Sequence, residues 1–170
     1  GDLAGVGCMV DSCGRCETCA DGEEQYCNGM VGTYNGPFTP GENTYGGYSK
    51  TIVVKEPFVL RIRHAEKDLP GVAPLLCAGI TTWAPLRQWG AGPGKTVGVV
   101  GLGGLGHMAV KLAHALGAKV VLFTTSAAKA ADARRLGADE VCLSTDPAQM
   151  AAWAGRLHLI VDTVAAPHDL

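Results

Sequence analysis

The chain has 170 residues, of which 47% are hydrophobic and 18% charged, and its formal net charge is -2. This composition is that of an ordinary globular protein with one or two domains. The lack of a basic stripe or an acidic tail argues against nucleic acid or a membrane surface as a partner. We expect a cytoplasmic protein. The sequence starts with Gly1-Asp2 rather than Met and ends soon after an expected strand, so we also expect an internal piece of a longer protein.

Residues 3–10 are expected to form a strand in which Cys8 is a small buried residue. A cysteine cluster follows in one short loop and comprises Cys13, Cys16, Cys19 and, after seven intervening residues, Cys27. Intervals of three residues let the first three thiols curl around one ion, and the fourth completes a tetrahedron of the kind that zinc prefers. A zinc ion with four thiolate ligands has no open position, so it would hold this lobe together. The alternative is a redox-active Cys-x-x-Cys pair, which needs only two of these thiols.

The cysteine lobe and its flanking segments resemble a known family. Gly5-Val-Gly-Cys-Met-Val-Asp-Ser-Cys13 and Gly46-Gly-Tyr-Ser-Lys50 are similar to the zinc-dependent medium-chain alcohol dehydrogenases. The nearest branch is that of the cinnamyl alcohol dehydrogenases and bacterial aldehyde reductases, and the resemblance covers essentially the whole chain. It implies that residues 1–80 are part of a β-rich, GroES-like catalytic domain and that residues 81–170 are the first part of an NADP-binding domain.

The middle of the chain is expected to lead from this first domain into the second. Residues 29–47 are rich in Gly, Pro and Asn and are typical of a loop with turns, whereas residues 48–54 and 58–62 are expected to be strands. Residues 74–89 are expected to form a helix that connects the two domains. From its chemistry alone, Cys77 would be a buried thiol. The resemblance of the segment Leu75–Thr82 implies instead that Cys77 supplies one thiolate to a catalytic zinc, whose other family ligands, a Cys and a His beside a Glu, are not found in this chain.

A strand, a glycine turn and a helix then follow one another. Residues 97–100 are an apolar run, and an amphipathic helical pattern runs from residue 105 to residue 116, before Gly117. Between them stands a Gly-x-Gly-x-x-Gly motif, which in this context predicts a dinucleotide-binding turn that places a pyrophosphate at the helix N-terminus. The alternative is a glycine-rich turn without a ligand. The cofactor-binding residues expected here are Gly101, Gly103, Gly104, Leu105 and Gly106.

The end of the next strand, residues 119–124, predicts which dinucleotide binds. NAD-binding folds place an acidic residue near this point, but here the chain has Thr124, Thr125 and Ser126, with Lys129 close behind. Hydroxyls and a cation suit the ribose phosphate of NADP, and the family resemblance indicates the same. The alternative is that Ser126 only caps a helix over residues 127–136 and that Lys129 is a solvated surface residue.

The remaining sequence continues the alternation of strands and helices. Residues 140–143 and 157–162 are expected strands, and Asp146-Pro147 is a helix start whose helix runs to about residue 153. The resemblance implies that the backbone of Thr163 and Val164 lies near the nicotinamide ribose, and His168 is expected to be a loop residue. The pattern predicts part of a Rossmann-type α/β domain, a doubly wound parallel sheet in the strand order 3-2-1-4.

The resemblance implies an oxidoreductase that transfers hydride between NADP(H) and a small-molecule alcohol or aldehyde, with zinc polarising the substrate oxygen. It leaves a homodimer open for the full-length protein, and residues 1–170 alone are expected to be inactive. Two alternatives come from other classes of protein. One is a non-catalytic NADP-binding sensor that keeps only the structural zinc, and the other is a zinc-thiolate interaction module attached to an incidental half of a Rossmann fold.

Overall fold

The structure is a computed structural model that describes residues 1–39 and 41–167. The chain divides into two compact units, Gly1–Cys77 and Ala78–Leu170. The sequence-based boundary after residue 80 stays a prediction. Within the described residues no single helix is long and apolar enough to cross a membrane. The helices over Glu66–Leu76 and Ala78–Gln88 meet that test only as a pair, on length and composition.

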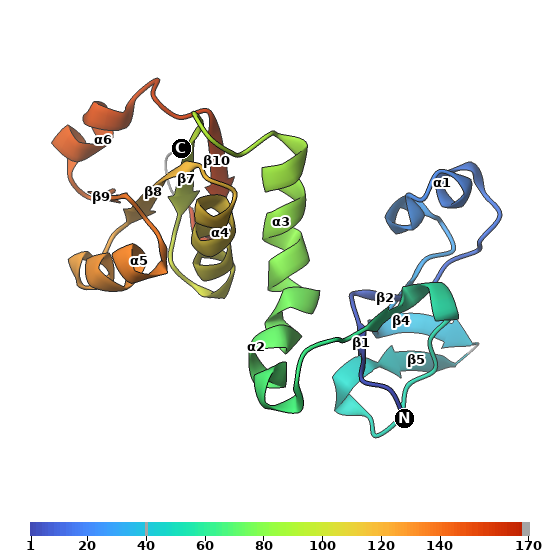
Figure 1. The fold of residues 1–170 in the computed structure, drawn as a ribbon. Helices are drawn as coiled ribbons and strands as arrows, with labels where there is room; N and C mark the ends of the chain where they lie inside the picture. Colours follow the sequence, from blue (N-terminus) through green and yellow to red (C-terminus); the bar gives the residue numbers. More distant parts are fainter. Residues whose placement is uncertain (40, 168–170) are drawn as a thin grey trace. The chain divides into compact units, whose positions relative to one another are not determined.

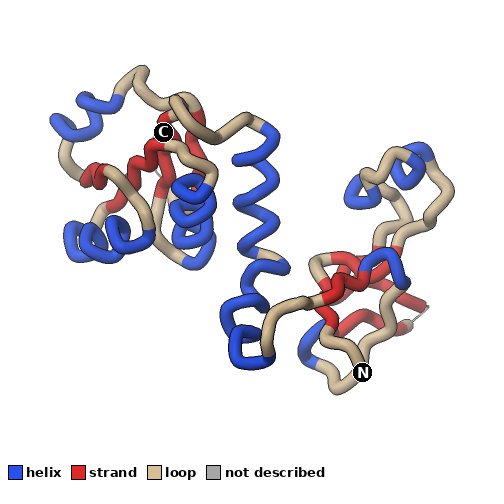
Figure 2. Tube along the Cα trace, in the orientation of Figure 1, coloured by secondary structure: helices blue, strands red, loops and turns tan. Residues whose placement is uncertain are grey.

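The first unit is built from short antiparallel strand pairs (Figures 1 and 2). Strand β1 (Ala4–Val6) pairs with β6 (Val59–Arg61), β2 (Met9–Asp11) with β3 (Val31–Gly32), and β4 (Tyr34–Thr39) with β5 (Glu42–Tyr45). The α-helices are α1 (Glu17–Ala20) and α2 (Leu69–Val72). Short 3₁₀ helices cover Glu24–Tyr26, Gly46–Tyr48, Glu56–Phe58, Glu66–Asp68 and Ala73–Leu76. The loop between β2 and β3 carries α1 away from the strands, as Figure 1 shows, and the four cysteines belong to this loop.

Several expectations for this unit are wrong. Residues 29–47 are not a loop with turns, because β3, β4 and β5 lie within them. The β4–β5 hairpin is irregular: Asn35 has a positive φ of 52°, and the Thr44 hydroxyl donates to the Gly32 carbonyl while it accepts from the Gly36 amide. Such side-chain bonds let a Gly- and Pro-rich segment pair despite its poor strand pattern.

The other differences concern strand and helix limits. The expected strand over residues 3–10 is two strands, β1 and β2, and Cys8 lies between them with its side chain exposed rather than buried. Residues 49–54 have no strand partner in the described chain, so the expected strand there is absent. The expected helix over residues 74–89 is broken at Cys77, whose φ of -128° and ψ of -74° are not helical.

The second unit is a parallel sheet with helices on both faces. Its strands are β7 (Thr96–Val100), β8 (Lys119–Thr124), β9 (Glu140–Leu143) and β10 (Leu159–Asp162), and their order is β10-β7-β8-β9. This order confirms the predicted arrangement of a partial Rossmann-type sheet, with the fourth strand beside the first. The helices are α3 (Ala78–Gln88), α4 (Gly104–Ala115), α5 (Ala130–Leu136) and α6 (Pro147–Trp153), with a 3₁₀ turn over Ala127–Lys129.

Side chains along the central strands point alternately to the two faces of the sheet, so the core has one part on each face. Val97, Val99, Val120 and Leu122 pack on one side with residues of α3, α4 and α5, including the fully buried Leu86, Ala109, Val110 and Ala133. Val121 and Phe123 face the other side, where Met150 and Trp153 of α6 cover them together with Cys142. Strands covered on both faces read as continuous apolar runs, which is why β7 and β8 are recognisable in the sequence.

Candidate functional site

The four lobe cysteines lie together at the end of the loop that leaves β2. One ligand atom from each of Cys13, Cys16, Cys19 and Cys27 lies within 4.8 Å of every other. The Cys16 and Cys19 sulfurs are 3.4 Å apart, and those of Cys13 and Cys19 are 3.9 Å apart. A tetrahedral zinc ion with Zn–S bonds of about 2.3 Å requires sulfurs about 3.8 Å from one another. The donor set and its spacing therefore fit a closed, four-thiolate zinc site.

Hydrogen bonds around the cluster favour the thiolate form at some positions. The Thr18 hydroxyl, with the Cys19 amide and thiol, lowers the pKa of Cys16 from 9.0 to about 6. The backbone amides of Arg15 and Cys16 lower the pKa of Cys13. The Cys13 amide has the same effect on Cys27, but burial and the neighbouring thiols outweigh it and raise the pKa of Cys27 to about 11. A zinc ion displaces the proton most easily from a thiol that ionises near neutral pH.

The base of the lobe is anchored by a lysine on the segment after β5. The Lys55 ammonium donates to the Ser12 carbonyl at 2.9 Å and lies 2.5 Å from the Asp11 carboxylate, of which one oxygen is buried. The Lys55 amide also donates to the Val10 carbonyl. These bonds fix the backbone immediately before Cys13. The sequence gives no obvious reason to expect this role for Lys55, because Lys55 is distant from Cys13 along the chain.

Cys77 lies outside the lobe, where the 3₁₀ helix Ala73–Leu76 ends. Its side chain is exposed, and its thiol lies beside that of Cys8. Burial together with the neighbouring Cys77 raises the pKa of Cys8. Among the described residues, the lobe is the one cluster of at least three metal-binding side chains, so Cys77 stands without a ligand set. Its role as a zinc ligand stays a prediction.

The glycine turn after β7 is closed on its inner side by backbone contacts. Gly101 has a φ of +86°, and its amide donates to the Phe123 carbonyl of β8. A Cβ at Gly106 would lie 2.1 Å from the Gly101 carbonyl oxygen, so the first turn of α4 touches the turn directly. This is the close packing of helix against strand that the third glycine of the motif permits.

On its outer side the same turn is open. A Cβ at Gly103 or Gly104 would meet no atom within 4 Å, and Leu105 is partly exposed. Gly103 is the N-cap of α4 and has no side chain to accept from the first amides of the helix. Those amides and the positive end of the helix dipole are therefore available to an anion.

The segment after β8 lies beside this turn. The Lys129 ammonium is 3.5 Å from the Leu102 carbonyl oxygen, within the glycine motif. Thr125 is exposed and Ser126 is half-buried. Thr124, in contrast, is buried, and its hydroxyl accepts from the Ser126 amide, so it helps to shape the loop, and its cofactor-binding role stays a prediction. Ser126 precedes the 3₁₀ turn but makes no side-chain cap, which contradicts the expected capping bond.

The segment after β10 reaches the same end of the sheet. The Thr163 hydroxyl donates to the Val100 carbonyl at 2.7 Å, and a Cβ at Gly101 would lie 2.5 Å from Val164. Thr163 and Val164 therefore form one wall of the glycine turn. The structure thus brings every predicted cofactor-binding residue to one edge of the sheet. His168 lies outside the described residues.

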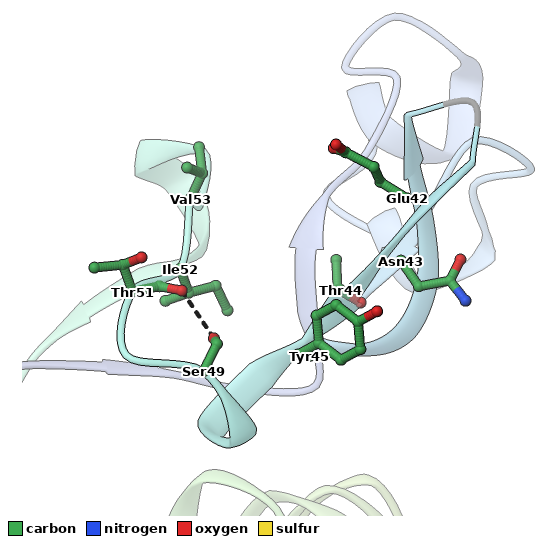
Figure 3. A pocket seen from close by; sticks show the side chains of 8 residues that line it. All are labelled: Glu42, Asn43, Thr44, Tyr45, Ser49, Thr51, Ile52 and Val53. Carbon is green, nitrogen blue, oxygen red and sulfur yellow. Dashed lines mark hydrogen bonds between the residues drawn. The ribbon is translucent and has the colours of Figure 1, made fainter.

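A surface pocket elsewhere in the first unit contains none of the predicted site residues. It has a volume of about 170 Å³ and lies between β5 and the segment after it, as Figure 3 shows. The Ser49 hydroxyl donates to the Thr51 carbonyl on its rim. Of the described residues that line this pocket, Glu42 is the one carboxylate and the others have uncharged side chains, so it offers no cluster of metal ligands, and we assign it no function.

Known proteins match this chain over its whole length. A sequence profile described as "Zinc-binding dehydrogenase" matches residues 104–170. Aldehyde reductase YahK of Escherichia coli (strain K12) is 63% identical over 172 aligned residues, which cover 100% of this chain and 49% of that protein. Over its whole length the chain is similar to zinc-dependent medium-chain alcohol dehydrogenases and aldehyde reductases. It thus spans about half the length of the curated relatives that it matches.

Solved structures support the same branch, that of cinnamyl alcohol dehydrogenases and aldehyde reductases. Cinnamyl alcohol dehydrogenase SbCAD4 from Sorghum bicolor superposes with a TM-score of 0.91 at 50% identity, over 99% of this chain and 48% of that one. A cinnamyl alcohol dehydrogenase from Helicobacter pylori complexed with NADP(H) gives a TM-score of 0.87 at 42% identity, over 99% and 47% of the two chains. The predicted fold and the predicted resemblance to this family are confirmed.

Besides the role of Lys55, sequence reasoning missed two features of the site. The contact between Cys8 and Cys77 joins residues far apart in the sequence, and no local pattern signals it. The hydroxyls of Ser12 and Thr18 lie beside lobe sulfurs, and here a signal did exist. Ser12 directly precedes Cys13, and Thr18 stands between Cys16 and Cys19, so their place in the sequence already put both residues near the proposed metal ligands.

Proposed function

We propose that this chain is part of an oxidoreductase that transfers hydride between NADP(H) and an alcohol or aldehyde. The observation that supports this most is the open glycine turn beside a strand end that carries Thr125, Ser126 and Lys129 and no acidic residue. A carboxylate at that position would bind the ribose of NAD, whereas a phosphate on that ribose needs donors and a positive charge. The relative from Helicobacter pylori, complexed with NADP(H), agrees with this assignment.

The cofactor would lie along the edge of the sheet. The amides at Gly103 and Gly104 would hold the pyrophosphate, and Ser126 and Lys129 the ribose phosphate, while the backbone at Thr163 and Val164 would lie near the nicotinamide ribose. When bound, the nicotinamide supplies or accepts the hydride. The protein fixes the cofactor through backbone contacts that close the turn from within, at Gly101 and Gly106.

Zinc would occupy two kinds of site in the full-length protein. The four lobe cysteines would hold a structural ion, because their sulfurs already surround one point at suitable distances. Cys77 would be one ligand of a catalytic ion, which when bound acts as a Lewis acid on the substrate oxygen. Its exposed thiol is compatible with that role.

The proposal is tested on zinc-replete full-length protein with a panel of aldehydes, by following the absorbance of NADPH and, separately, NADH. We expect reduction that prefers NADPH, together with a zinc content above one ion per chain. Tight NADPH binding without turnover, at one zinc ion per chain, would instead favour a non-catalytic NADP-binding protein. Failure to bind either dinucleotide would overturn the proposal.

A further inference from the structure

The hydroxyls of Ser12 and Thr18 each lie beside one sulfur of the cysteine cluster. The Thr18 Oγ1 atom is 3.1 Å from the Cys16 sulfur, and the Ser12 Oγ atom is 3.5 Å from the Cys19 sulfur. The Gly29 amide donates to the Cys27 sulfur at 3.3 Å. Each of these three sulfurs therefore has a hydrogen-bond partner outside the cluster itself.

The direction of these bonds follows from the chemistry of a zinc-bound thiolate. A sulfur on zinc carries no proton and can only accept, so a neighbouring hydroxyl must donate its proton to it. Four thiolates around one divalent zinc ion also leave an excess of negative charge on the sulfurs. A donated proton draws off part of this charge and makes that sulfur a weaker nucleophile.

The two hydroxyls are placed differently. Ser12 is 5% exposed, and its backbone is fixed by the Lys55 ammonium, which donates to the Ser12 carbonyl. Among the described residues, Cys19 is the side chain that is hydrogen-bonded to the Ser12 hydroxyl. Thr18 is only partly buried, in a surface pocket that Cys13, Cys16 and Cys27 also line and Cys19 does not. Cys13 is exposed and Cys16 and Cys19 are half-buried, so reagents from solvent reach these three thiols, whereas Cys27 is buried.

We propose that Ser12 and Thr18 are positioning residues of the zinc lobe, which donate hydrogen bonds to Cys19 and Cys16 and protect these two thiolates from electrophiles and from loss of zinc. The inference rests on the proposed structural zinc. Each hydroxyl acts on one named sulfur, so its removal has a site-specific consequence. General loosening of the lobe would instead expose all four sulfurs together.

The test compares zinc-loaded full-length protein with its Ser12→Ala and Thr18→Val variants. Iodoacetamide alkylates exposed thiolates with loss of iodide, and peptide mass spectrometry gives the rate at each cysteine, while a chromogenic chelator gives the rate of zinc release. Loss of an outer hydrogen-bond partner typically costs about 10- to 100-fold in metal affinity, so we expect at least about tenfold faster release. We expect Ser12→Ala to accelerate alkylation chiefly at Cys19, and Thr18→Val chiefly at Cys16.

Conservative variants provide the matched controls. Thr18→Ser and Ser12→Thr keep the hydroxyl and should restore the wild-type order of labelling. Thr18 is on the surface, so its variants test the idea even if Ser12→Ala fails to fold. Zinc present with unchanged release and labelling in Thr18→Val would overturn the inference and leave the zinc site intact. Wild-type protein without zinc in the lobe would overturn both, and metal analysis distinguishes the two results.

Discussion

The Thr163 hydroxyl donates a hydrogen bond of 2.7 Å to the Val100 carbonyl, and so joins the ends of two neighbouring parallel strands, β10 and β7. The Thr163 amide donates to the same oxygen at 3.1 Å. These two hydrogen bonds to one acceptor hold Val164 against the glycine turn. Val164 lies so close to Gly101 that a Cβ at Gly101 would collide with it. The wall of the proposed cofactor site is therefore built into the sheet rather than left to a free loop.

The glycine motif gives a prediction that separates folding from ligand binding. Gly106→Ala would place a Cβ 2.1 Å from the Gly101 carbonyl oxygen, so we expect a lower Tm and loss of NADPH binding. Gly103→Ala is the matched control: its Cβ would meet no protein atom within 4 Å, and its φ of -95° suits alanine. It should keep the wild-type Tm yet weaken NADPH, because the backbone could no longer approach the pyrophosphate. Equal effects of both substitutions on Tm and on affinity would contradict this.

Lys129 gives a prediction about cofactor selectivity. Lys129→Ala removes a cation beside the glycine turn, and a lost charge-assisted hydrogen bond is worth about 1.5–3 kcal/mol, or roughly tenfold to a hundredfold in affinity. We expect the Kd of NADPH to rise by this factor and that of NADH to change little. Thr125→Asp should act in the same direction through repulsion of the phosphate. Lys95→Ala serves as the control, because it removes the same charge just before β7, at the opposite end of that strand from the turn.

Cys77 and the lobe cysteines should respond differently to substitution by serine. Cys77→Ser should lower the zinc content by one ion per chain and abolish turnover, while the lobe and NADPH binding persist, since neither depends on Cys77. Cys16→Ser should instead lower the Tm and loosen residues 13–27, because it removes a ligand whose pKa is held low by Thr18. Zinc analysis, fluorescence titration with NADPH and thermal unfolding distinguish these patterns. If the Cys77→Ser variant keeps its full zinc content and normal turnover, Cys77 is no zinc ligand and is only a thiol beside Cys8.

Much of the second unit could be predicted from the sequence, and the reasons are local. The apolar runs of β7 and β8 and the helical pattern of α4 each lie in a continuous stretch, and Gly117, with φ of +84°, ends the last of these as expected. The first unit was harder, because its pairings depend on distant partners. The β4–β5 hairpin uses the Thr44 hydroxyl to bond Gly32 and Gly36, while residues 49–54 have a strand-like pattern but no partner strand among the described residues.

The candidate site shows the same division. The cysteine lobe and the glycine turn are short sequence motifs, so their members could be named in advance. Thr124 could not be separated from Thr125, because only the folded loop turns the Thr124 hydroxyl towards the Ser126 amide. The roles of Lys55 and of the Cys8–Cys77 contact depend on chain segments that meet only after folding.

Asp146 gives a prediction about pH. Its carboxylate accepts from the Ala148 and Gln149 amides at the start of α6, and hydrogen bonds from Gln149 and Ala148 lower its pKa below 3.8. A lowered folded-state pKa means that this stabilisation is complete above the ordinary pKa and is lost as the pH falls through the folded value. Amide exchange in α6 should therefore be faster in Asp146→Ala than in wild type at pH 7, and the difference should shrink below pH 3.8.

Asp146→Asn is the control for this prediction. It keeps a cap acceptor that does not titrate, so its exchange rates should stay close to wild type near neutral pH. A difference between wild type and Asp146→Ala that persists unchanged at low pH would show that the carboxylate charge is not what stabilises the helix start.

Transfer of deuterium from labelled NADPH tests the account most directly. Zinc-replete full-length protein is incubated with an aldehyde and NADPH deuterated at C4 of the nicotinamide, using the two stereoisomers in separate reactions. Mass spectrometry then locates the label in the alcohol. The account predicts that one of the two isomers delivers its deuterium to the carbinol carbon, and that NADH labelled in the same way delivers far less. Absence of deuterium in the alcohol from both isomers, or absence of any alcohol, would contradict the assignment of this chain to an NADP-dependent alcohol and aldehyde oxidoreductase.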